Sequence, residues 1–97
     1  MFTHPGALRA PHLAERDKAA KEIIRLWVSS EDQHIAIRHE IWNDPAAWGL
    51  CLCDIARHVA RAFAQEGGDE GEAFDRIIEG FQIELQNPTD EPSGEIN

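Results

Sequence analysis

The sequence predicts a single α+β domain: a short helix, a two-stranded antiparallel hairpin and then two amphipathic helices. Residues 34–42, HIAIRHEIW, alternate apolar and polar side chains as a half-buried strand does. Residues 45–65 and 70–86 instead repeat apolar side chains at helical spacing, and a glycine pair separates these two runs. We expect the two C-terminal helices to pack on one face of the hairpin, as in other α+β domains.

The strand that would pair with residues 34–42 is the run EIIRLWV at residues 22–28, which is rich in Ile, Val and Trp. The intervening SSEDQ is polar and suits a hairpin turn. The alternative is a first helix that continues as far as Trp27, because the apolar residues of this run also fit a helical period. We favour the hairpin.

The helix boundaries have sequence signals of their own. The run LAERDKAAK at residues 13–21 is rich in helix formers and predicts a short exposed helix. Asp44 as N-cap and Pro45 at the first helical position begin the long helix. Asp69, with Glu72 three residues later, predicts a capping box for the last helix.

Composition divides the chain into three parts. Residues 1–11, with two prolines, predict an N-terminal arm, residues 12–87 the domain, and residues 88–97 an acidic disordered tail. No apolar run is long enough for a membrane span, and the N-terminus lacks the order of a secretory signal. Two cysteines one residue apart are typical of a reduced protein, so we expect a cytoplasmic location.

The net charge of −9 comes from the last third of the chain. Residues 1–61 hold eight basic and eight acidic residues, whereas residues 62–97 hold Arg76 against ten acidic ones. Binding to nucleic acid or to an anionic membrane needs a basic cluster, and the sequence has none. We therefore expect neither as a partner.

Most of the chain resembles a known family. The segments EIIRLWV, HIAIRHEIWNDPAAWGLCLCDIARHVARAFAQEG and NPTDEPSG are similar to a family of short bacterial proteins catalogued as a domain of unknown function. The resemblance runs from residue 5 to Gly94. It implies a single compact domain, and it implies no activity, ligand, cofactor or catalytic residue. This chain has two thiols in its CLC segment, where aliphatic or small residues would be expected.

One group on the long helix has the composition of a nucleophilic site. Cys51, Asp54 and His58 are spaced i, i+3 and i+7 and so project from nearly the same face. A thiolate beside an imidazole is used in nucleophilic and redox catalysis. Seven residues on a helix span about 10 Å, however, too far for a Cys–His hydrogen bond. We interpret Cys51 as a small core residue and His58 as a partner of Asp54.

The histidines and cysteines do not have the spacing of a metal site. Cys51 and Cys53 point about 200° apart on a helix, and His34 and His39 fall on opposite faces of a strand. We therefore expect no metal and no cofactor. No phosphate-binding loop or nucleophile elbow is present in the sequence either.

Three tryptophans give the best candidate for a contact site. Trp27, Trp42 and Trp48 are expected to gather at the strand ends nearest residues 43–47, either as a site or as a seal between helix and sheet. The environment of Arg25 distinguishes a binding site from a structural seal, because burying this side chain unpaired would cost several kcal/mol. Arg25 in a pocket would favour a ligand, whereas pairing with Glu40 or exposure to solvent would favour a structural role.

We therefore predict a non-enzymatic, homodimeric protein-interaction module. Two strands alone are marginal and leave both sheet edges open. The first strand also has apolar side chains of both parities, so two copies would join their hairpins into a four-stranded sheet or pack their second faces together. The alternative is a small-ligand-binding domain or minor enzyme with a groove near the three tryptophans. The candidate contact residues for a ligand or protein partner are Arg25, Trp27, Arg38, His39, Trp42 and Trp48.

Overall fold

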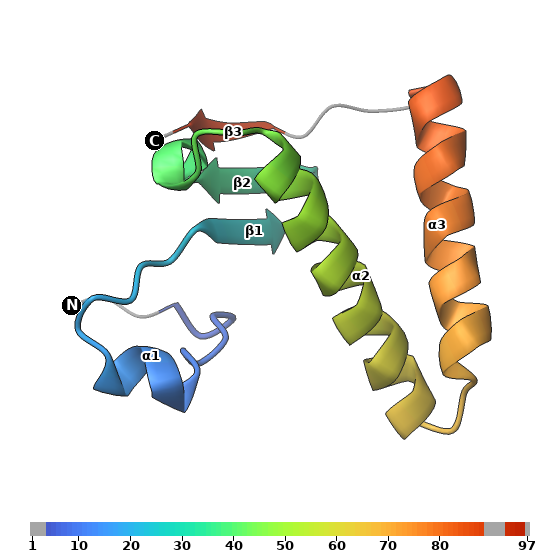
Figure 1. The fold of residues 1–97 in the computed structure, drawn as a ribbon, viewed down its shortest axis with the longest axis horizontal. Coiled ribbons are helices and arrows are strands. Elements are labelled where there is room, and N and C mark those ends of the chain that lie inside the picture. The colour runs from blue at the N-terminus through green and yellow to red at the C-terminus, as the bar shows by residue number, and fades with distance from the viewer. Residues whose placement is uncertain (1–3, 89–92, 97) are drawn as a thin grey trace.

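The computed structural model describes residues 4–88 and 93–96, and it confirms the α+β class. Figure 1 shows a small sheet from which a long helical hairpin extends, with a short helix on the other side of the sheet. The elements in chain order are α1 (His12–Arg16), β1 (Ile24–Val28), β2 (Gln33–Ile37), the 3-10 helix η1 (His39–Ile41), α2 (Ala46–Gln65), α3 (Glu70–Gln86) and β3 (Ser93–Ile96).

The β1–β2 hairpin is confirmed, and the alternative of a helix extended to Trp27 is wrong. The strands are antiparallel with Ile24 opposite Ile37 and Val28 opposite Gln33. A polar loop closes them: the Ser29 amide donates to the Asp32 carbonyl over 2.9 Å, and the Asp32 amide donates to the Ser29 hydroxyl over 3.2 Å. The serine therefore satisfies backbone groups that a four-residue loop would otherwise leave unpaired.

β2 is shorter than the alternation of residues 34–42 predicts. The last rung of the ladder is a 2.8 Å hydrogen bond from the Arg38 amide to the Ile23 carbonyl. Beyond it the chain turns into η1, so Trp42 lies after the strand rather than at its end. A strand needs a partner for its backbone groups, and β1 has no residues left to pair there.

A third strand was not predicted. β3 pairs parallel to β2, from His34 opposite Ser93 to Ile37 opposite Ile96, and gives the sheet order β1-β2-β3. The expected disordered tail is therefore wrong for residues 93–96, while residues 89–92 and 97 lie outside the described residues. Strand pairing uses backbone groups, so an acidic composition does not prevent it. One edge of β2 is consequently occupied by the chain's own C-terminal segment.

α1 is shorter than the predicted helix over residues 13–21. It ends at Arg16, and Asp17 adopts an extended conformation with φ −101° and ψ 105°. The Asp17 carboxylate accepts a 2.9 Å hydrogen bond from the amide of Ala19. Aspartate side chains compete in this way with helical hydrogen bonding and favour a turn.

The predicted start of α2 is confirmed. The Asp44 carboxylate accepts a 3.0 Å hydrogen bond from the amide of Ala46, and Pro45 has helical angles of φ −55° and ψ −24°. Proline costs nothing here because its missing amide would have no helical partner.

The α2–α3 turn depends on a glycine. Gly67 has φ 102°, and its amide donates to the Ala64 carbonyl while the Gly68 amide donates to the Phe63 carbonyl, over 3.1 and 3.0 Å. This pair of bonds is a Schellman cap. The Asp69 carboxylate then accepts from the Glu72 amide over 2.9 Å and caps α3 as predicted. The chain reverses direction within a few residues, and α3 runs back along α2.

The two halves of the fold share little packing. Extensive contacts among the described residues join β1 to β2, β2 to β3 and α2 to α3, and neither long helix packs extensively on the sheet. The two helices therefore pack on each other, whereas the sequence predicted that they would pack on a face of the hairpin. Ala60 is the single fully buried hydrophobic residue in this part of the chain. No helix among the described residues has the length and apolar character needed to cross a membrane.

The Asp69 cap gives a direct test of the helical turn. Replacing Asp69 with Ala should lower the free energy of unfolding by about 1 kcal/mol, because the Glu72 amide loses its acceptor. The matched control is Asp75→Ala, which removes the same side chain from an exposed position inside α3. Urea unfolding at a fixed protein concentration measures both. Equal stability of the two variants would contradict a role for the cap.

Candidate functional site

α2 has two apolar stripes, and α3 covers one of them. The covered stripe consists of the small residues Ala56, Ala60 and Ala64, of which Ala60 is buried and the others half-buried. Beside this stripe, the Arg57 guanidinium lies 4.9 Å from the ring centroid of Phe74 in a cation–π contact. Alanines one turn apart allow α3 to approach closely.

The second stripe of α2 is uncovered. It consists of Leu52, Ile55, Val59 and Phe63, which are 41 to 58% exposed. At 100° per residue these four side chains fall within an arc of about 80°, so they form a continuous apolar surface. We call this set the α2 stripe. The sequence predicted these four residues as part of the apolar repeat of the helix, and it did not predict that they would form an exposed surface.

The sheet exposes a second apolar surface. Strand alternation and register place Ile24, Leu26 and Val28 on the same face as Ile35 and Ile37. Leu26 is 52% exposed and Val28 is 77% exposed. The aliphatic face of the hairpin is therefore only partly covered by the described chain.

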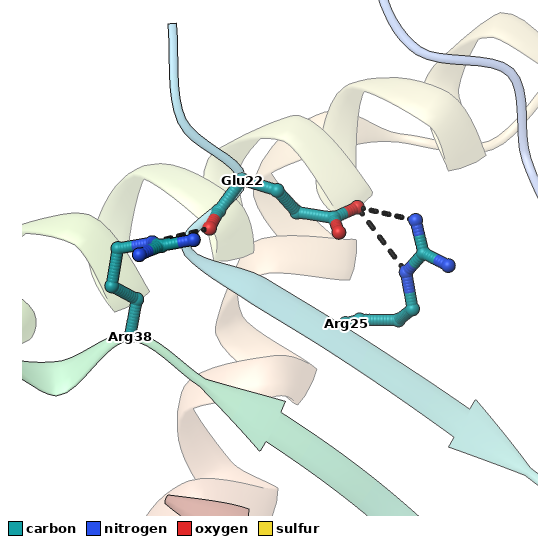
Figure 2. A network of polar contacts seen from close by, with 3 residues as sticks. All are labelled: Glu22, Arg25 and Arg38. Carbon is teal, nitrogen blue, oxygen red and sulfur yellow. Dashed lines mark hydrogen bonds and ion pairs between the residues drawn. The ribbon is translucent and has the colours of Figure 1, made fainter. Parts of the chain in front are cut away.

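Arg25 has the environment expected for a structural role. Its side chain is 54% exposed and donates to the Glu22 carboxylate from Nη2 and Nε, over 3.0 and 3.3 Å. Figure 2 shows that Glu22 also accepts, through its backbone carbonyl, a 3.2 Å hydrogen bond from Nε of Arg38. Glu22, rather than Glu40, is thus the partner of Arg25, and Glu40 instead lies 4.0 Å from Arg38.

The three tryptophans do not form one cluster. Trp42 and Trp48 meet edge to face with ring centroids 5.1 Å apart, and Nε1 of Trp48 donates to the His39 carbonyl over 3.2 Å. Trp27 instead contacts His4, with centroids 5.0 Å apart. The end of β1 lies beside the start of β2 in an antiparallel hairpin, so Trp27 and Trp42 belong to opposite ends of the sheet.

The six predicted contact residues therefore separate into two groups. Arg25 and Trp27 lie on β1, with Arg38 linked to Arg25 through Glu22, whereas His39, Trp42 and Trp48 surround η1. A groove of about 170 Å³ runs beside β1, and Arg25 and Trp27 are among the residues that line it. Small-molecule pockets usually occupy roughly 300 to 1,000 Å³, so this groove is small for one. A groove of about 430 Å³ at the α2–α3 turn is lined by none of the six residues.

Cys51, Asp54 and His58 do not form a catalytic arrangement. Within the described residues no side-chain hydrogen bond or ion pair joins any two of them, and both Asp54 and His58 are exposed. The proposed pairing of His58 with Asp54 is likewise absent there. No group of three His, Cys, Asp or Glu side chains in residues 4–88 or 93–96 is arranged to hold a metal ion.

Comparison with known proteins identifies the family. Residues 7–89 match the family described as Domain of unknown function (DUF5076). The chain belongs to this family. A solved structure from the photosynthetic bacterium Rhodopseudomonas palustrus CGA009, which has the provisional name of a pyruvate dehydrogenase, is 40% identical to this DUF5076 protein. The match covers 97% of each chain with a TM-score of 0.74. No curated protein matches the chain.

The contacts around Glu22 predict unequal roles for the two arginines. Replacing Arg38 with Ala should lower the free energy of unfolding by about 1 kcal/mol, because Arg38 ties the start of β1 to the end of β2 through a backbone carbonyl. Arg25→Ala removes an exposed ion pair and should cost less than about 0.5 kcal/mol. Denaturant unfolding of both variants checks the order. A larger loss for Arg25→Ala would instead indicate that its exposed ion pair matters more than the link across the hairpin.

Proposed function

We propose that this DUF5076 protein is a non-enzymatic interaction module that works as a homodimer. The observation that supports this proposal is the accessible surface of the single chain, which is 8621 Å². A folded monomer of 10.9 kDa is expected to expose about 5,600 Å². The chain thus exposes about 3,000 Å² more than a closed globule of its size.

The dimensions of the chain agree with its surface. The radius of gyration is 15.4 Å, whereas about 12 to 13 Å is typical of a compact chain of this length. The excess surface includes apolar parts of regular elements, namely the α2 stripe and the aliphatic face of the sheet. Exposed apolar patches of this kind usually mark sites where another protein binds.

The surface area is sufficient for a stable dimer. Stable interfaces bury about 800 Å² on each partner, and obligate homodimers bury more. Covering even a third of the excess surface would meet this requirement. No other element among the described residues packs extensively on these surfaces.

Ligand binding and catalysis have less support. The groove beside β1 is small, and the larger groove at the α2–α3 turn contains none of the six predicted contact residues. Arg25 reaches solvent, and Nε of Arg38 and Nε1 of Trp48 each donate to a backbone carbonyl. The pyruvate dehydrogenase name belongs to the similar structure alone.

Mass and thermal stability test the proposed homodimer together. Sedimentation equilibrium at micromolar concentration should give a mass near twice 10.9 kDa. Because dimerisation stabilises the folded state by mass action, the melting temperature should rise with protein concentration. A mass of 10.9 kDa combined with a melting temperature independent of concentration would contradict the proposal.

A further inference from the structure

We propose that the α2 stripe is where the second copy binds, so that α2 packs against α2 of its partner across a two-fold axis. This inference rests on the proposed homodimer and specifies its interface. The hairpins were the interface expected from the sequence, but β3 already occupies the outer edge of β2. The α2 stripe is continuous, apolar and free of charge, and its four residues lie along a single helix.

The composition of α2 around the stripe supports burial by another apolar surface. Around the helix axis, Arg57 and Arg61 lie about 120° or more from every residue of the stripe. Asp54 lies about 100° from Ile55, which is the stripe residue nearest to it. The ionisable side chains nearest the stripe are the Cys51 thiol and His58, about 40° and 60° from Ile55. The side of a helix that faces water typically has charged or polar residues, whereas this arc has four apolar side chains.

The spacing of the stripe suits a second helix. Its residues are separated by three, four and four positions. Ile55, Val59 and Phe63 thus form a ridge of side chains four positions apart, through which helices commonly pack, and this ridge would be the seam between the two helices. The stripe extends about 16 Å along the axis, from Leu52 to Phe63. A two-fold interface places the same patch of both subunits in contact, so an apolar stripe without charge is complementary to itself.

The α2–α3 turn offers a place for the partner at the end of this seam. The groove of about 430 Å³ adjoins Phe63, and Ala73 and Ile77 form its apolar floor. The charged residues Asp69, Glu72 and Arg76 also line it. Phe63 itself is the most exposed residue of the stripe. A partner helix that crosses the stripe would reach this groove with an apolar side chain, and two helical hairpins would then form a four-helix arrangement.

Two leucines of α2 provide a matched test. Leu52 belongs to the α2 stripe, and Leu50 lies about 200° away around the same helix, where it is 71% exposed. Replacing Leu52 with Glu should convert the dimer to a monomer in sedimentation equilibrium, because two carboxylates would be buried in the seam. Leu50→Glu introduces the same charge two residues away and should leave the mass unchanged.

Alanine variants keep the test valid if Leu52→Glu does not fold. Alanine is a better helix former than leucine, so both Leu52→Ala and Leu50→Ala should retain α2. Leu52→Ala should weaken dimerisation by at least about tenfold, since each dimer loses the side chain twice, and Leu50→Ala should not.

The outcomes separate this inference from the homodimer proposal. A monomeric wild-type protein would contradict both. A dimeric wild type that stays dimeric with Leu52→Glu, or that weakens equally with Leu50→Ala and Leu52→Ala, would overturn the α2 interface alone. If Leu26→Glu on the sheet dissociates that dimer, the aliphatic face of the hairpin is the interface instead.

Discussion

The area of apolar surface that 97 residues can bury within one chain limits everything else in this structure. A helical hairpin has one shared interior, and a three-stranded sheet has none until another layer covers it. Here the two units lie side by side in the chain without packing extensively on each other. Each therefore keeps an apolar face that faces outward, and the radius of gyration is correspondingly large. These exposed apolar faces are the reason for proposing that a second subunit completes the fold.

α2 has apolar side chains on two sides, one against α3 and one exposed. Its small residues Ala56, Ala60 and Ala64 face α3, where close approach of two helices needs little side-chain volume. Its large residues lie in the α2 stripe, away from α3. Large apolar side chains gain most from burial, at about 25 cal/mol for each Å² removed from water. The small side chains of α2 thus pack within the chain, whereas its large apolar side chains stay exposed in the single chain.

The sheet has a comparable division. β1 carries Leu26 and Val28 on the aliphatic face, and Arg25 and Trp27 on the other. On the second face, Arg25 contacts Glu22 and Trp27 contacts His4. The aliphatic face has no comparable covering among the described residues. The larger apolar surface of the hairpin therefore stays partly exposed.

Local signals in the sequence predicted most of the elements. Asp44, Pro45, Gly67 and Asp69 determine where the long helices begin and end through hydrogen bonds and backbone angles of neighbouring residues, so their effect is legible without a structure. The alternation of β1 and β2 likewise predicted the hairpin. β3 was missed because parallel pairing with β2 depends on a backbone edge far away in the sequence. The end of β2 was misplaced because alternation continues after β1 has no residues left to pair.

The candidate site was harder to predict than the fold. Trp27 was expected beside Trp42 because both were assigned to strand ends, but antiparallel pairing places those ends at opposite sides of the sheet. The α2 stripe is encoded by the same apolar spacing that predicted the helix. Spacing alone gives the width of an apolar arc, whereas the position of α3 decides which part of that arc is covered. The α2 stripe therefore became visible as an exposed surface only with the arrangement of the two helices.

Amide hydrogen exchange along α2, measured across a dilution series, tests most directly whether the single chain is incomplete. If a second subunit covers the stripe, the amides from Leu52 to Phe63 should lose protection in parallel with dissociation, because exchange then follows the population of separated chains. If these amides remain equally protected at concentrations where the chain is monomeric, the helical hairpin is stable alone. That result would contradict the view that a second subunit completes the fold.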